Sequence, residues 1–192
     1  MKRSYRYSHF LILAGALAPF SSVPAQPALS SASAQTRTQA IAASFTKSKH
    51  VVKEKRGVRI EKYKRVESEP VVKPNPQDYS GTYEVPDMGF AIQLRVARDG
   101  TIEGTGFEPV GPDLSVRRSF TLRNGKIDGA LLTATQVYAN GTQNRFEGAF
   151  MNRTSFDSPA DKGFTTFGLG VIGKEIVLGG NTINRFFYES NK

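Results

Sequence analysis

Two arginines lie among apolar residues at strand spacing, where a cation would have a definite chemistry. Arg118 alternates with apolar residues between Leu114 and Leu122, and Arg185 lies between Ile183 and Phe187. Side chains two apart on a strand share a face, so each arginine would face the way its apolar neighbours do. One interpretation is an internal cation that binds the carboxylate of an amphipathic ligand. The other, which we favour because a buried unpaired charge is costly, is structural: an arginine at a barrel end, stacked on an aromatic ring, or turned outward by a bulge.

Aromatic side chains could line the same site. They are Phe107, Phe120, Tyr138, Phe146, Phe150, Phe164 and Phe167. Because the chain has no tryptophan or cysteine, filling of the core is the favoured explanation for these rings. If a ligand binds inside the domain, the residues expected to contact it are Arg118, Arg185, Tyr83, Phe120, Phe146 and Phe150.

Composition excludes most catalytic centres. Without cysteine there is no thiol nucleophile, thiolate metal site or disulfide. His50 is the only histidine beyond the N-terminal segment, so no Ser-His-Asp triad or imidazole metal site can form in the C-terminal part. Ser44 to Lys47 matches the S-x-x-K motif, but its S-D-N and K-T-G partners are absent. We predict a non-enzymatic protein with no metal or cofactor, and a hydrolase using two convergent carboxylates is the least favoured alternative.

The first 25 residues have the pattern of a secretory signal peptide. A basic start precedes an apolar run from Phe10 to Phe20, and a small-x-small exit ends at Ala25. The apolar run is too short to span a bilayer, which takes roughly 18 residues or more. We expect cleavage after Ala25, with Ala34 as the alternative end, no transmembrane segment, and an exported protein that is periplasmic or secreted.

Residues 26–76 are predicted to form a flexible linker, because small and polar residues dominate their first part and prolines their last. Within it, a short strand over 58–66 is the alternative. The net charge of +9 resides largely here. Residues 35–76 carry eleven basic and four acidic side chains, whereas residues 77–192 carry twelve and thirteen. The basic segment 47–65 is therefore the expected contact for an anionic envelope surface, with a solvated spacer as the alternative. Nucleic acid is not expected as a partner of an exported protein.

From Tyr79 onward, short β-rich runs alternate with turn signals, which predicts antiparallel strands joined by hairpins. The strongest turn signals are Asp99-Gly100, Asn124-Gly125 and Asn140-Gly141, since Asx-Gly pairs supply positive φ angles. The expected strands are 81–85, 92–96, 101–107, 114–122, 127–138, 144–152, 164–170, 174–178 and 182–189. This pattern favours an all-β domain over residues 77–192: a small antiparallel up-and-down barrel of about eight strands, with a β-sandwich as the alternative and a disordered N-terminal region.

The two ends of this domain resemble those of calycin barrels, the lipocalins among them. Gly81-Thr82-Tyr83 resembles the G-x-W opening of their first strand, with Tyr in place of Trp. Arg185 lies on the last expected strand, where those barrels carry an Arg or Lys that packs over the aromatic ring. The resemblance covers the two ends and nothing between them. It implies a lipocalin-like barrel that binds small hydrophobic molecules, with Arg185 packed over Tyr83.

These patterns together predict an exported protein whose barrel binds a small apolar, amphipathic or carboxylate-bearing ligand. The alternative is an envelope interaction module, in which a solid β domain docks a protein or a surface polymer with the help of the basic segment. The interior of the barrel separates the two. An empty apolar interior above roughly 300 Å³ favours the ligand binder, whereas a filled core with an exposed apolar patch favours the module.

Overall fold

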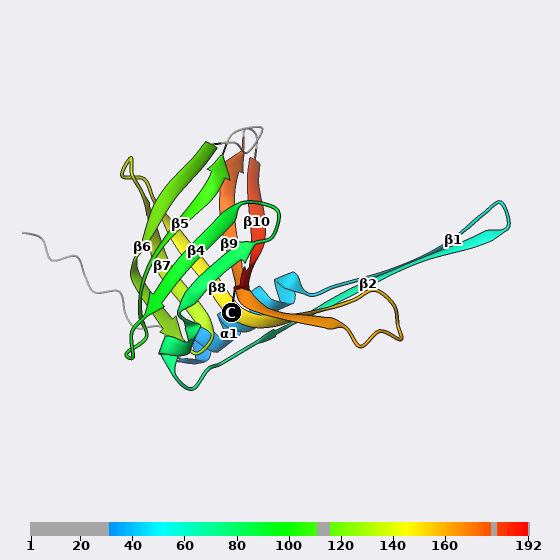
Figure 1. The fold of residues 1–192 in the computed structure, drawn as a ribbon, viewed down its shortest axis with the longest axis horizontal. Coiled ribbons are helices and arrows are strands. Elements are labelled where there is room, and N and C mark those ends of the chain that lie inside the picture. Colours follow the sequence, from blue (N-terminus) through cyan, green and yellow to red (C-terminus); the bar gives the residue numbers. More distant parts are fainter. Residues whose placement is uncertain (1–30, 111–115, 178–179, 192) are drawn as a thin grey trace, which may run out of the picture.

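The computed structural model describes residues 31–110, 116–177 and 180–191. Its elements are shown in Figure 1. They are α1 (Ser31–Phe45), β1 (Lys47–Lys55), β2 (Val58–Pro70), the 3-10 helix η1 (Pro76–Tyr79), β3 (Gly81–Val85), β4 (Phe90–Val96), β5 (Thr101–Val110), β6 (Val116–Asp128), β7 (Leu131–Tyr138), β8 (Gln143–Phe156), β9 (Phe164–Val177) and β10 (Gly180–Ser190). The predicted signal peptide, residues 1–25, lies outside the described residues. The alternative cleavage end, Ala34, lies within α1, so cleavage there would remove the first turn of this helix.

Strands β3 to β10 form a closed antiparallel barrel (Figure 1). Each strand pairs with the next along the chain, and β10 closes the barrel by pairing Glu189 and Ser190 with Glu84 and Tyr83 of β3. The predicted up-and-down barrel of about eight strands is confirmed, because hairpin follows hairpin without a crossover. The β-sandwich alternative is wrong, since a closed barrel is a single sheet that joins its own first strand.

Two of the three Asx-Gly signals mark hairpin turns and the third does not. Gly100 and Gly141 each have a φ of +82° in the turns before β5 and β8. Asn124, with a φ of +51°, instead lies inside β6, where the pairing register shifts between Arg123 and Lys126. Positive φ occurs in some β-bulges as well as in tight turns, so the dipeptide alone does not distinguish them. The strand expected at 127–138 is therefore split, and the true turn follows Asp128.

Side chains at alternate strand positions fill the interior of the barrel. The buried residues of this core are Tyr79, Tyr83, Ile92, Leu94, Val96, Ile102, Phe120, Leu122, Ile127, Leu132, Ala134, Tyr138, Phe146, Phe150, Leu169, Val171 and Tyr188. Rings occupy the end that η1 closes: Tyr79 stacks on Phe150 with centroids 4.2 Å apart, and Phe150 stacks on Phe167 at 6.2 Å. The Tyr79 hydroxyl accepts a hydrogen bond from the Lys73 amide at 2.7 Å, which ties the incoming chain to this end.

The flexible linker predicted for residues 26–76 is wrong from Ser31 onward, where a helix replaces it. Helix α1 packs on the outer face of the barrel (Figure 1), burying Ala34, Thr38, Ile41, Ala42 and Phe45 along one face. Alanine and threonine bury little apolar area, so this stripe does not stand out in the sequence. Its partners are Leu131, Ala149, Met151 and Phe187 on the outer side of the barrel.

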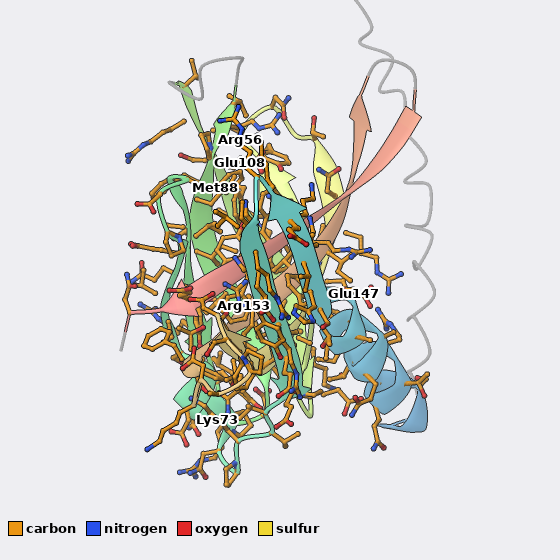
Figure 2. All side chains as sticks on the ribbon, turned by 90° about the vertical axis from the view of Figure 1, so that its right-hand side faces the viewer. Arg56, Lys73, Met88, Glu108, Glu147 and Arg153 are labelled. Atoms are coloured by element: carbon orange, nitrogen blue, oxygen red, sulfur yellow. The ribbon has the colours of Figure 1, made fainter. Side chains whose placement is uncertain are left out.

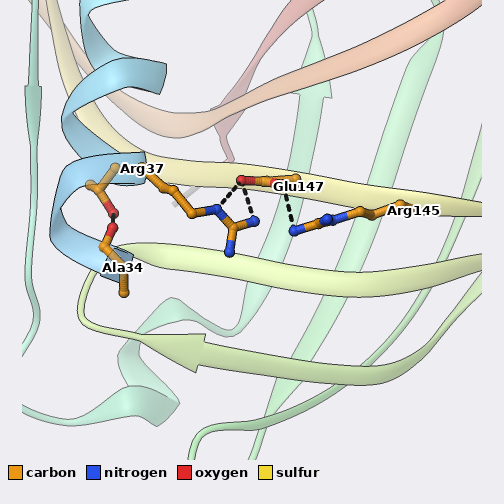
Figure 3. A network of polar contacts seen from close by, with 5 residues as sticks. Ala34, Arg37, Arg145 and Glu147 are labelled. Carbon is orange, nitrogen blue, oxygen red and sulfur yellow. Dashed lines mark hydrogen bonds and ion pairs between the residues drawn. The ribbon is translucent and has the colours of Figure 1, made fainter. Parts of the chain in front are cut away.

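One ion-pair network fastens α1 to the barrel (Figure 3). The Arg37 guanidinium donates from Nε to Oε1 of Glu147 on β8 at 2.8 Å. The other carboxylate oxygen of Glu147 lies 3.1 Å from the guanidinium of Arg145. Because Arg37 and Glu147 are both mostly buried, the contact fixes where the helix lies against the strand.

A long hairpin made by β1 and β2 replaces the second half of the predicted linker. The two strands pair from Lys47 with Val66 to Lys55 with Val58, around a two-residue turn at Arg56-Gly57. Both turn residues have positive φ, 53° and 73°, as a primed hairpin turn requires. The inner end of β2 continues onto β8, and the rest of the hairpin extends away from the barrel (Figure 1).

Candidate functional site

Arg118 lies near the tip of the β5–β6 hairpin and already has a carboxylate partner. Its Nε donates to Oε1 of Glu108 at 2.8 Å, and its guanidinium carbon lies 4.4 Å from the centroid of the Tyr138 ring. The Tyr138 hydroxyl donates to the same Glu108 oxygen at 3.0 Å. The Arg118 side chain is half exposed, whereas that of Glu108 is mostly buried. This arrangement corresponds to the structural interpretation of Arg118, because a ligand carboxylate would have to displace Glu108.

Three tyrosine hydroxyls in the barrel keep their protons well into the alkaline range. Burial, aided by the nearby Glu108 carboxylate, raises the pKa of Tyr138 to about 12. Burial also raises the pKa of Tyr188, with Glu108 contributing, and that of Tyr83. Neutral phenols at these positions can donate hydrogen bonds, but they supply neither a base nor a nucleophile near neutral pH.

Arg185 lies on the outer face of β10, so the packing over Tyr83 that the calycin resemblance implied is not found. Its guanidinium donates to the Ser44 carbonyl at the end of α1, at 2.9 Å. It shares its face with Phe187, which packs against α1, whereas Tyr83 is buried in the barrel core. The helix on the outside gives this arginine a carbonyl partner, a contact that strand alternation alone could not anticipate.

The remaining predicted ligand contacts are part of the core. Tyr83, Phe120, Phe146 and Phe150 point into the barrel, where each is buried by its neighbours. The Tyr83 hydroxyl donates to the Tyr79 carbonyl at 2.6 Å, so its polar group is satisfied within the chain. The structure brings these four residues together and separates them from Arg185.

A hollow of about 690 Å³ lies on the outer face of the barrel, over β3 to β7. A cross-strand row of outward-facing side chains, four polar and one aliphatic, lines it together with apolar groups that include Ala91, Phe107, Phe120 and Tyr138. The row runs through Thr82, Gln93, Thr105, Thr121 and Val137. Of the six predicted ligand contacts, only Phe120 reaches this hollow.

The β1–β2 hairpin has two chemically different faces. Cross-strand partners in an antiparallel ribbon share a face, and successive residues alternate between faces. Odd-numbered residues of β1 therefore lie with even-numbered residues of β2. This face, which we name the lysine face, carries lysines and aliphatic side chains and no acid. Its members are Lys47, Lys49, Lys53, Lys55, Lys62 and Lys64, with Val51, Val58, Ile60 and Val66.

The opposite face, which we name the reverse face, neutralises its own charges. It holds both acids of the segment 47–65, Glu54 and Glu61, together with two arginines. His50 Nε2 lies 2.6 Å from the Glu61 carboxylate, and the Arg59 guanidinium lies 3.7 Å from it. Arg65 pairs with Glu67 further along β2.

The lysines of the lysine face are all exposed. Within the described part of the chain, none of these six lysines takes part in an ion pair. Figure 2 views the molecule from the side toward which the hairpin points, with Arg56 at the hairpin tip. The positive charge of the segment is therefore concentrated on one side of a ribbon whose other side is close to neutral.

The sequence identified the basic segment 47–65, but the hairpin that sorts its lysines onto one face was not predicted. The signal was present as a period-two pattern, with lysines two apart on both sides of Arg56-Gly57. Recognising it required treating that dipeptide as a turn, which then pairs the two halves. The Glu108 partner of Arg118 carried no comparable signal, because the two residues meet through strand register.

Comparison of the chain with protein-family models, curated proteins and solved structures gives no match. The up-and-down strand order is consistent with the calycin resemblance but assigns no specific family. Among the described residues, no group of three or more His, Cys, Asp or Glu side chains is placed to hold a metal ion. The helices in the described ranges include none long and apolar enough to cross a membrane.

Proposed function

We propose that the protein is an exported, non-enzymatic interaction module that binds an anionic surface through its β1–β2 hairpin. The observation that carries the proposal is the lysine face, which gathers six exposed lysines without a single carboxylate. Such a one-sided concentration of charge raises the local density of anions and speeds association with a polyanionic partner.

The filled barrel supports the module over a container for a small molecule. The positions at which a ligand would lie are occupied by core side chains, including the stacked rings of Tyr79, Phe150 and Phe167. Arg118, near the tip of the β5–β6 hairpin, is paired with Glu108. Rigid support is what such a barrel can supply to an appended binding element.

The hairpin is long enough to hold its lysines far from the acidic side chains of the barrel. Nine residues of β1 at about 3.3 Å each give a ribbon about 30 Å long. Charges further apart than about 8 Å are largely screened at physiological salt. The acids of the barrel domain therefore leave the field at the outer part of the hairpin almost unchanged.

The proposal is tested by shortening the hairpin in the chain that begins at residue 26. Replacing residues 50–63 with Asn-Gly keeps Lys49 paired with Lys64 and supplies a two-residue turn. The full-length hairpin should bind both dextran sulfate and vesicles containing phosphatidylglycerol, and higher salt should weaken both interactions. The shortened variant should bind neither. Equal binding by the two proteins, or no binding by the full hairpin, contradicts the proposal.

A second candidate function is small-molecule binding in the outer hollow over β3 to β7. Its volume of about 690 Å³ lies within the range of ligand sites. Native mass spectrometry of protein purified from its source should then show a bound small molecule. The Thr105→Tyr variant, which places a ring in the hollow, should lose that molecule. A source-purified protein with the mass of the chain alone argues against this candidate.

A further inference from the structure

The lysine face pairs like charges in a way that does not serve the stability of the hairpin. Lys49 and Lys64 are direct cross-strand partners on this face. Like charges directly opposite each other destabilise a sheet. On the reverse face, by contrast, cations lie next to carboxylates, since both His50 and Arg59 pair with Glu61. An uncompensated lysine pair within a ribbon that elsewhere compensates its cations indicates a negative partner outside the chain.

Exposed aliphatic side chains alternate with these lysines. Val58 is 60% exposed and Ile60 is 42% exposed, and both lie next to the turn at the tip. Their cross-strand partners are Lys55 and Lys53. The outer part of the lysine face is therefore a surface of alternating cationic and apolar groups, and it extends away from the barrel (Figure 1).

This combination selects a lipid surface among anionic partners. A hydrophilic polyanion interacts favourably with the lysines only and leaves the exposed aliphatic groups in water. A bilayer interacts favourably with the lysines and with the aliphatic groups. Its anionic headgroups attract lysines, while aliphatic groups enter the boundary between headgroups and acyl chains. Lysine suits this position, since its flexible stem lies along apolar surface while its ammonium stays among phosphates.

We infer that the lysine face is a docking surface for a bilayer containing anionic lipid, in which Val58 and Ile60 enter the headgroup region and the reverse face points away. The inference rests on the proposed function and names its partner. It makes two claims that the proposed function does not: one face of the hairpin binds, and apolar contact contributes to binding.

Two matched pairs of variants of the full chain from residue 26 test these claims. The first pair consists of two double variants, each of which removes two positive charges from β2. One is Lys62→Gln/Lys64→Gln on the lysine face, and the other is Arg59→Gln/Arg65→Gln on the reverse face. Ile60→Ser and Val52→Ser each remove an exposed aliphatic side chain, again from opposite faces, with Val52 49% exposed. Circular dichroism establishes that each variant is folded. Binding is measured by sedimentation with phosphatidylcholine vesicles, with and without phosphatidylglycerol.

The lysine-face variants should lose binding and the reverse-face variants should keep it. At about 1 kcal/mol for each lysine near an anionic membrane, removing two lysines should weaken vesicle binding about 30-fold. Removing the two arginines should change it less than about threefold, since both are paired with acids. Ile60→Ser should weaken binding several-fold and Val52→Ser should not. Vesicles without phosphatidylglycerol should not bind.

Other results overturn the inference in ways that distinguish it from the proposed function. If the charge variants of both faces weaken binding equally, or if Ile60→Ser binds like the unmodified chain, the lipid inference is wrong and the anionic-surface proposal stands. Tighter binding to dextran sulfate or to duplex DNA than to anionic vesicles has the same meaning. If the unmodified chain binds none of these, the proposed function fails as well.

Discussion

Packing inside the barrel can be tested at Gly106 on β5, where the Phe120 ring lies directly over the glycine. A Cβ atom at Gly106 would come 2.4 Å from Phe120 Cζ and 2.7 Å from the backbone oxygen of Ala91. Carbon atoms pack at about 3.5–4.0 Å, so Gly106→Ala requires a shift of about 1 Å in the ring. The backbone of β4 must shift as well, because the Ala91 oxygen also lies inside van der Waals contact.

The expected cost follows from these two contacts. Overpacking in a core costs about 1–3 kcal/mol, and a clash with both a ring and a backbone atom belongs near the upper end. Replacing glycine by alanine restricts the unfolded chain, which by itself raises the free energy of unfolding by about 0.4–1 kcal/mol. The free energy of unfolding should therefore fall by about 2 kcal/mol, and Tm by about 4–8 °C for a chain of this length.

Gly173 on β9 provides the matched control. A Cβ atom there would meet no atom of the described residues within 4 Å, so Gly173→Ala restricts the unfolded chain without creating a clash with them. It should leave the free energy of unfolding unchanged or raise it by up to about 1 kcal/mol. Urea denaturation of both variants and the unmodified chain gives these values, and equal m-values show that the same surface is exposed on unfolding.

A double variant shows whether Phe120 is the cause. In a Phe120→Leu background the ring is gone, so Gly106→Ala should cost at least about 1 kcal/mol less than it does alone. An unchanged cost would assign the effect to the Ala91 carbonyl. If Gly106→Ala alone is as stable as Gly173→Ala, the packing of Phe120 over Gly106 is refuted.

Two further predictions concern the helix on the outer face and the tyrosines inside. Phe45 is buried against Phe187, with ring centroids 6.2 Å apart, so Phe45→Ala should lower the free energy of unfolding by about 3 kcal/mol, whereas Gln39→Ala on the exposed side of α1 should change it by less than about 0.5 kcal/mol. Similar values for both would show that α1 is not docked. Burial raises the pKa of Tyr138 to about 12, above that of an exposed phenol, so the unfolded chain releases this proton first. Stability should hold below pH 10 and fall as the pH rises from 10 through 12, and Tyr138→Phe should flatten that fall in denaturation measured at each pH. A steeper fall in the variant would contradict the assignment.

Much of the barrel could be predicted from local patterns. The alternation of Ile92, Leu94 and Val96 with polar residues requires a strand with one buried face, and β4 has that face in the core. Successive hairpin signals require neighbouring strands to pair in order, which leads to the up-and-down arrangement. Asn124-Gly125 forms a bulge instead of the predicted turn, since a residue with positive φ occurs in some bulges as well as in turns.

The N-terminal half of the structure could not be predicted as far. Helix α1 is rich in alanine and serine, and the spacing of its buried residues becomes informative only against the outer face of β7 to β10. An exposed ribbon has no buried face, so the segment 47–65 lacks the alternation of a half-buried strand, and only the turn at Arg56-Gly57 sets its register. The composition shows that this segment is positively charged, but it does not show that the lysines lie on one face of the hairpin.

The sequence by itself determined most strands of the barrel, where most of its turns fall, where the positive charge lies and which catalytic centres its residue types exclude. Each of these depends on residue types and on spacings of a few positions. Only the tertiary structure decided that Glu108 meets Arg118, that Arg185 faces α1 and not Tyr83, and that six lysines share one face of the hairpin. The physical reason is that strand register and packing on the outer face bring together residues far apart in the chain, and these contacts leave no local periodicity in the sequence.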